Sequence, residues 1–219
     1  MSTARLPDDP MQNGAKPVAR QPRGDATRQA ILNAAEQVFA DLGYAAARLE
    51  DVAQVVGIRR PSIVYYFPGK QQLYDAVEAE IFGAMHAFVT DRMTGTEKPM
   101  DRLLALFDAW LDFLVQRPTA ARIIQRVVAD PAPRGDNPVL FSDTALRDLE
   151  AILDAGVTDG SFRPIPAMHI LNSIAAGALF YVCNARQLGD RRQYDPADAD
   201  TLAAFRAIIH QQARIVVSA

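Results

Sequence analysis

Hydrophobic residues recur every three or four positions along most of this 219-residue chain, which is the spacing of a helix that buries one face. No useful length of the chain alternates between polar and apolar residues, so no sheet is expected. Clusters of proline, glycine and polar residues interrupt the helical pattern. The pattern therefore predicts an all-α fold of about nine helices, with no internal repeat.

The longer helices and the breaks between them set the expected boundaries. Asp25 is a candidate N-cap for the first helix, which ends at Gly43. Further long helices are expected at about 70–93, 100–116, 119–129, 139–157, 167–187 and 199–217. The breaks fall at 94–99, Pro118, 130–138, 159–164 and a charged, proline-containing linker before 199.

Two short helical stripes meet at Gly57, within residues 49–70. Glycine at a helix C-terminus tolerates a positive φ, and Pro61 stands at the start of the second stripe, where its missing N–H has no intrahelical partner. Ile63 and Phe67 turn that second helix inward. Two helices joined by so tight a turn form a helix-turn-helix, whose second helix can enter a DNA major groove.

Charge supports this interpretation locally. The whole chain has a net charge of -3 and a pI of about 5.6, so it is not a generic binder of polyanions. Between Asp51 and Asp75, however, every charged residue is basic: Arg59, Arg60 and Lys70. A local basic face on an acidic chain is typical of a site-specific DNA binder rather than a nonspecific one.

The outward side chains of the second short helix are the candidate DNA contacts. Arg60 is the main candidate for reading a base, because arginine pairs bidentately with guanine O6 and N7; the alternative is a solvated or phosphate-bound arginine. Ser62 is a small group facing the groove, while Pro61 sets the helix start and at most makes an apolar base contact. Tyr65 and Tyr66 either contact DNA or pack inward, and Tyr66 is the better core candidate.

Composition narrows the functional classes. A hydrophobic content of 49% supplies a core, and the single cysteine, Cys183, excludes an intrachain disulfide. The chain has neither an apolar run near the roughly 18 residues of a membrane span nor a signal-peptide pattern, so a cytoplasmic location is expected. Three scattered histidines, without HExxH, a glycine-rich phosphate loop or GxSxG, indicate no enzyme, no cofactor and no metal site.

The chain divides into three expected parts. Residues 1–23 form a polar tail, in which Arg20 and Arg23 either extend an arm into a minor groove or belong to a solvated leader. Residues 24–70 contain the helix-turn-helix and form the expected DNA-binding domain, and residues 71–219 form a helical body.

The order of motifs over about residues 27–77 resembles the TetR family of bacterial transcriptional regulators. The resemblance is carried by Ile31-Leu32-x-Ala34-Ala35-x-x-x-Phe39, Gly43-Tyr44, Asp51-Val52-Ala53, Gly57-Ile58 and Tyr66-Phe67-x-x-Lys70-x-x-Leu73. It implies a homodimer in which three N-terminal helices read double-stranded DNA and a helical body binds a small molecule. It also implies that Lys70, at the start of the fourth helix, faces a phosphate.

Three positions depart from the family pattern. Arg48 stands where the family has a capping Ser or Thr before the second helix, and Arg59 stands where Ser is common before the third. Val64 occupies the place of a phosphate-binding Tyr. We therefore expect DNA binding that depends more on Arg48, Arg59 and the Tyr65-Tyr66 pair.

The body contains candidate ligand and dimer contacts, each with a packing alternative. The ligand candidates are aromatic or polar side chains at helical spacing: Phe88, Phe107, Trp110, Phe113, Arg122, Gln125, His169, Asn172 and Cys183. The dimer candidates are small residues on one helix and an apolar seam on the last: Ser173, Gly177, Leu202, Phe205, Ile209, Ala213 and Val216.

These observations predict a sequence-specific transcriptional regulator, a repressor released from a near-palindromic operator by an unidentified small-molecule effector. The alternatives are a ligand-gated activator and a helical ligand carrier that binds no DNA. Arg48, Arg59, Arg60 and Lys70, grouped around a helix-turn-helix, argue against the carrier.

Overall fold

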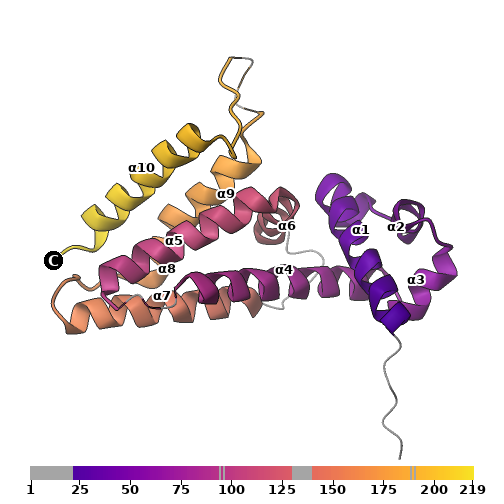
Figure 1. Cartoon of the computed structure of the whole chain (residues 1–219), viewed down its shortest axis with the longest axis horizontal. Coiled ribbons are helices and arrows are strands. Elements are labelled where there is room, and N and C mark those ends of the chain that lie inside the picture. Colours follow the sequence, from indigo (N-terminus) through magenta and orange to yellow (C-terminus); the bar gives the residue numbers. More distant parts are fainter. Residues whose placement is uncertain (1–21, 94, 96, 130–139, 188, 190) are drawn as a thin grey trace, which may run out of the picture.

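The computed structural model describes residues 22–93, 95, 97–129, 140–187, 189 and 191–219. A small unit of three helices lies at one end of the molecule, and a larger helical body carries the C-terminus at the other (Figure 1). The described residues form no β-strand, and their one β-type pairing is an isolated bridge between Phe162 and Ser218. The predicted all-α fold is therefore confirmed.

The N-terminal unit consists of α1 (Pro22–Ala46), α2 (Leu49–Val56) and α3 (Arg60–Tyr66). Helix α1 begins at a proline, so Asp25 lies in its first turn and is not the N-cap that we expected. Gly43 takes φ 78° and ends the straight part of α1, as predicted, although one further turn continues to Ala46. Gly57, at φ 76°, closes α2 by donating its N–H to the carbonyls of Ala53 and Gln54.

Helix α2 has part of an N-terminal capping box, although Arg48 stands where the family has a capping Ser or Thr. Arg48 is the N-cap residue, and its backbone N–H donates to a carboxylate oxygen of Asp51 at 2.8 Å. A side chain at the third helical position that accepts from the N-cap N–H is one half of a capping box. Arg48 therefore stays exposed without leaving its own N–H unsatisfied.

The body consists of seven further helical segments. Their bounds are α4 (Lys70–Arg92), α5 (Pro99–Gln116), α6 (Pro118–Ala129), α7 (Leu140–Thr158), α8 (Ala167–Ile170), α9 (Ala176–Cys183) and α10 (Ala199–Val217). A π-helical segment, η1 (Leu171–Ala175), joins α8 to α9. If α8, η1 and α9 are counted as one helix, the described residues form nine helices, as expected. This combined helix ends at Cys183 and not near residue 187 as predicted.

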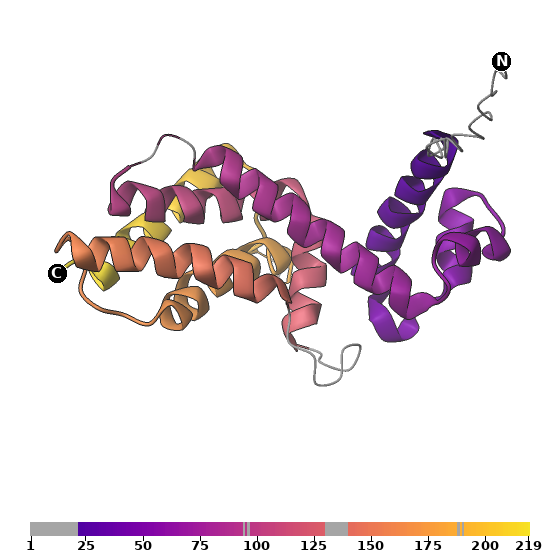
Figure 2. The same cartoon turned by 90° about the horizontal axis from the view of Figure 1, so that it is seen from below.

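Helix α5 is the centre of the body. It packs against α4, α6, α7, α9 and α10, and nine of its side chains are buried, among them Phe107, Trp110 and Phe113. Helix α4 runs without a break from the small unit into the body (Figure 2). The position of the small unit therefore depends on α4 and on whatever else contacts α1.

The second connection is a buried ion pair between α1 and the start of α6. Glu36 is 6% exposed and accepts from Nε of Arg117 at 2.9 and 3.1 Å, from Nη2 of the same guanidinium, and from the Thr119 hydroxyl at 2.5 Å. Glu80 of α4 lies 3.6 Å from the guanidinium as well. The hydrogen bond to Glu36 raises the pKa of Arg117, against the opposing effect of burial. Three helices thus meet at one arginine.

We predict that Arg117→Met lowers the free energy of unfolding by about 3–5 kcal/mol, because the buried Glu36 carboxylate loses its partner. Arg122→Met is the matched control, since Arg122 also joins α6 to α1 through Asp41 at 2.8 Å, but with both side chains at least 40% exposed. That variant should lose about 0–1 kcal/mol. Urea unfolding measures both, and equal losses would contradict a special role for the buried pair.

Candidate nucleic-acid interface

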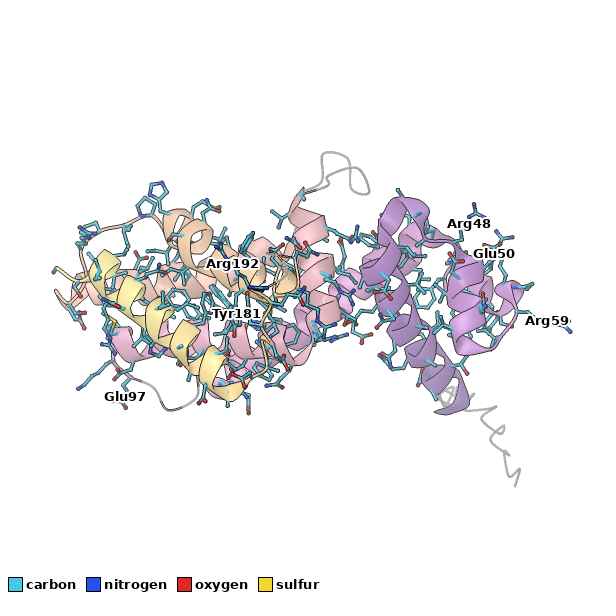
Figure 3. The ribbon with its side chains drawn as sticks, turned by 90° about the horizontal axis from the view of Figure 1, so that it is seen from above. Arg48, Glu50, Arg59, Glu97, Tyr181 and Arg192 are labelled. Carbon is cyan, nitrogen blue, oxygen red and sulfur yellow. The ribbon has the colours of Figure 1, made fainter. Side chains whose placement is uncertain are left out.

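The exposed face of α2 and α3 lies at the end of the molecule farthest from the C-terminus. Arg48 and Arg59 precede these two helices and project from the same end, together with Glu50 (Figure 3). Helix α3 rests on Ile63, which is fully buried, and on Phe67, which is 4% exposed. Its other side chains except Tyr66 are thereby turned to the outside, as the sequence pattern predicted.

The outward face of α3 is polar at its start and aromatic towards its end. Pro61, Ser62 and Val64 are exposed, and Tyr65 is 83% exposed. Tyr65 meets Tyr66 edge to face at 5.1 Å between ring centroids. Tyr66 is half-buried against the core, so of the two tyrosines Tyr65 presents the larger free surface to a ligand.

Arg60 has a partner within the protein. Its Nε lies 3.0 Å from Oε1 of Glu50, and both side chains are about 60% exposed. Glu50 is not among the predicted contacts, because a carboxylate ten positions earlier in the chain gives no sign of lying beside Arg60. The tight turn at Gly57 brings the first turns of α2 and α3 together and creates this pair.

Lys70 has a different environment from the one expected. Its ammonium donates to the carbonyls of Tyr44, Ala45 and Ala47 at 2.8, 3.3 and 3.1 Å, and it lies 4.5 Å from the Tyr44 ring centroid. An ammonium has three N–H donors, and three carbonyls at the end of α1 accept them. This arrangement fastens α4 to α1 and provides no free donor for a phosphate in the DNA-free protein.

Arg28 is a further basic group that the sequence analysis did not single out. It is exposed on α1, and its guanidinium carbon lies 5.1 Å from the centroid of the Phe67 ring. It therefore stands beside the C-terminal end of α3. No spacing rule could have placed it there, since the contact joins two helices that are distant in sequence.

The expected arm lies largely outside what can be described. Arg20 falls outside the described residues, and Arg23 belongs to α1 but its side chain is not described. The arm therefore stays a prediction from the sequence.

The expected ligand contacts lie in different environments: in the core, in an ion pair with α1, or at the surface. Phe107, Trp110 and Phe113 are 2–5% exposed and belong to the core, with Phe88 packed on Phe113 at 5.7 Å. Arg122 pairs with Asp41 of α1, while Gln125, His169 and Asn172 are exposed. Cys183 is half-buried, and burial raises the pKa of its thiol. The aromatic stripe therefore packs in the core, and its part in ligand binding stays a prediction.

An open polar hollow lies instead at the junction of the small unit and the body. Its lining comes from α1, α4 and the α5–α6 corner: Asn33, Glu36, Gln37, Glu80, Arg117 and Thr119. Nothing in its sequence spacing indicated it, because its residues come from three distant segments.

The predicted dimer seam on the last helix is wrong for two of its members. Ile209 and Ala213 are 3% and 0% exposed within one chain, and Leu202, Phe205 and Val216 pack against the same core. Phe205 stacks on Tyr181 of α9 at 4.1 Å. Ile209 and Ala213 are intramolecular because α10 carries two apolar stripes, and the stripe that contains them faces α5 and α9. The dimer role of Leu202, Phe205 and Val216 stays a prediction.

The outward surface of α9 and α10 is apolar in a different set of residues. Phe180, Ile208 and Ile215 are 53%, 50% and 66% exposed. Ile208 and Ile215 lie two helical turns apart on one side of α10. Ser173 is exposed and Gly177 half-exposed, so these two predicted residues remain available to a partner.

Among the described residues no group of three or more His, Cys, Asp or Glu side chains is placed to hold a metal ion. In the same part of the chain no helix is long and apolar enough to cross a bilayer.

Comparison with known proteins gives a consistent family assignment. The family model for bacterial regulatory proteins of the tetR family matches residues 31–77, and the model for the tetracyclin repressor-like C-terminal domain matches residues 99–212. The HTH-type transcriptional regulator RutR of Escherichia coli K12 is 29% identical over 189 residues, covering 81% of this chain and 84% of that protein. The HTH-type transcriptional repressor NicS of Pseudomonas putida is 27% identical over 194 residues, covering 87% and 92%.

Solved structures agree on the fold. A TetR family transcription regulator from Marinobacter aquaeolei superposes with a TM-score of 0.71 at 17% identity, over 90% of this chain and 97% of that one.

We predict that Lys70→Met lowers the free energy of unfolding by about 2 kcal/mol, since hydrogen bonds to a charged group contribute about 1.5–3 kcal/mol. Lys98→Met, at an exposed lysine that precedes α5, should change it by less than about 0.5 kcal/mol. Urea unfolding of the DNA-free protein measures both. Unchanged stability of Lys70→Met together with weaker DNA binding would instead support the phosphate contact.

Proposed function

The chain belongs to the tetR family of bacterial regulatory proteins, whose members bind DNA and regulate transcription, and from that premise we propose how it does so. A homodimer binds a near-palindromic operator through α3 and represses transcription, and a small molecule in the body releases it. The observation that carries the DNA-binding part is α3 itself, which is anchored by Ile63 and Phe67 and presents Arg60, Ser62 and Tyr65 outward.

Contacts to DNA fall into two classes in this proposal. Arg48 and Arg59 flank the starts of α2 and α3, where guanidinium groups are well placed to contact phosphates and fix the register. Arg60 reads a guanine, since it can donate to O6 and N7 at once. Tyr65 adds a phosphate or thymine-methyl contact. Arg28 extends the basic face at the other end of α3.

Repression requires the two α3 helices of a dimer to lie as far apart as two successive major grooves of the operator. Successive major grooves on one face of B-DNA are about 34–36 Å apart, so a two-fold dimer binds an operator with two related half-sites. The exposed apolar residues of α9 and α10, with Ser173 and Gly177, support a dimer through these helices. The similarity to RutR and NicS, a regulator and a repressor by name, supports repression.

Release follows from the connections between the body and α1. Helix α4 begins at the Lys70 contacts with α1 and packs on α5 and α7 in the body. Helix α6 holds α1 through Glu36–Arg117 and packs on α9. An effector that displaces α4 or α6 changes the spacing of the two α3 helices. Effector and operator then weaken each other by the same factor, typically about 5–150-fold.

We predict that Arg60→Ala weakens binding to a selected operator by about 1–3 kcal/mol and relaxes preference at one base pair of each half-site. Arg191→Ala, at an exposed arginine between α9 and α10, should leave affinity and preference unchanged. Fluorescence anisotropy on the operator and its single-base variants gives the ranking. An unchanged ranking with Arg60→Ala would remove Arg60 from base reading.

We predict that Ile215→Asp shifts the protein from dimer to monomer, because a carboxylate would be buried unpaired in the interface. Val128→Asp is the control, since Val128 is 69% exposed on α6 and as open as Ile215. Sedimentation velocity over a concentration series measures both. Dissociation by both variants alike, or by neither, would contradict an interface on α10.

A further inference from the structure

A carboxylate lies within the basic face that the proposed function assigns to DNA. Glu50 is the second residue of α2, and its Oε1 lies 3.0 Å from Nε of Arg60 at the start of α3. Both side chains are about 60% exposed. Glu50 projects from the same end of the molecule as Arg48 and Arg59 (Figure 3), so it also approaches any duplex that these arginines contact.

Stability does not account for this pair. An exposed ion pair contributes little to folding, because water screens the charges and the side chains lose freedom. The first turn of α2 is already served by Asp51, which accepts from the N–H of Arg48. On the DNA side, a carboxylate repels phosphate and lowers affinity for any duplex. Glu50 therefore weakens general DNA binding, and its place in the first turn of α2 adds only a small amount of stability.

The geometry of the contact suggests what the carboxylate does. Glu50 engages Arg60 through Nε, on the side of the guanidinium. Across the described part of the chain, Glu50 is the one group that pairs with the Arg60 guanidinium. The two terminal nitrogens of Arg60 are the pair that can donate end-on to guanine O6 and N7. Glu50 thus restricts the arginine, and no second group of the described chain competes with a base for its terminal nitrogens.

We propose that Glu50 is a positioning and specificity residue for DNA recognition, an inference that rests on the proposed function. It orients Arg60 for a guanine, and its charge opposes capture of the same guanidinium by a phosphate. A duplex with guanine at the right position offers two acceptors to the terminal nitrogens while Nε stays on Glu50. A duplex without it offers only phosphates, which the carboxylate repels.

The test compares Glu50→Gln with wild type on a selected operator, on its single-base variants and on a scrambled duplex, across salt. Glutamine keeps the size and an acceptor oxygen but removes the charge. Affinity for the scrambled duplex should rise about 3- to 10-fold. The slope of the logarithm of this affinity against the logarithm of the salt concentration should become steeper by about one. The preference for guanine at the Arg60 position should fall by about the same factor.

Glu97→Gln is the matched control. It makes the same change in net charge at an exposed glutamate near the α4–α5 connection, at the other end of the molecule (Figure 3). If both variants raise scrambled-duplex affinity equally and leave the preference intact, the proposal for Glu50 is wrong. If the wild-type protein binds the operator and the scrambled duplex equally, the proposed function is wrong, and this inference fails with it. That result differs from failure of the Glu50 proposal alone, in which the wild type still prefers the operator.

The double variant Arg60→Ala/Glu50→Gln separates positioning from direct contact. If Glu50 acts through Arg60, the double variant has the same base preference as Arg60→Ala alone. If Glu50 itself accepts from a cytosine amino group, Glu50→Gln relaxes a different base pair and does so in both backgrounds. That second result would overturn the positioning role.

Discussion

The buried pair of Glu36 and Arg117 is the interaction on which the arrangement of this molecule most depends. A carboxylate that is 6% exposed must keep its partner, because an unpaired buried charge is strongly unfavourable. Its partner stands at the α5–α6 corner and also approaches Glu80 of α4. The orientation of α1 relative to the body is therefore held at one point by three helices, with the exposed Arg122–Asp41 pair as a weaker neighbour.

Lys70 provides the second fixed point between α1 and the rest of the chain. Three carbonyls at the end of α1 accept from its ammonium, so α4 and α1 move as one piece at that end. A shift of α6 relative to α4 would strain Glu36, Arg117 and Glu80 at once. In the proposed release mechanism, this junction, with its open polar hollow, is where a change in the body is transmitted to α3.

The sequence predicted what depends on local pattern and missed what depends on distant contacts. Helical periodicity, Gly57 and the inward pair Ile63 and Phe67 were sufficient to identify the helix-turn-helix and the all-α fold. Periodicity could not say which of two apolar stripes on α10 faces its own chain, and so it assigned Ile209 and Ala213 to a partner. Lys70 and Arg60 each have partners from another helix, which no spacing rule reveals. The π-helical turn at Leu171–Ala175 likewise has no sequence signature in this chain.

The most direct test of the account is selection of duplexes from fragments of the genome that encodes the chain, followed by anisotropy with the full-length protein across salt. The account predicts one enriched, near-palindromic sequence, bound by two chains per duplex and preferred over a scrambled duplex by about 10³-fold or more. If no sequence is enriched, or if enriched and scrambled duplexes bind equally, the account is contradicted. A helical ligand carrier would then be the better description of this protein.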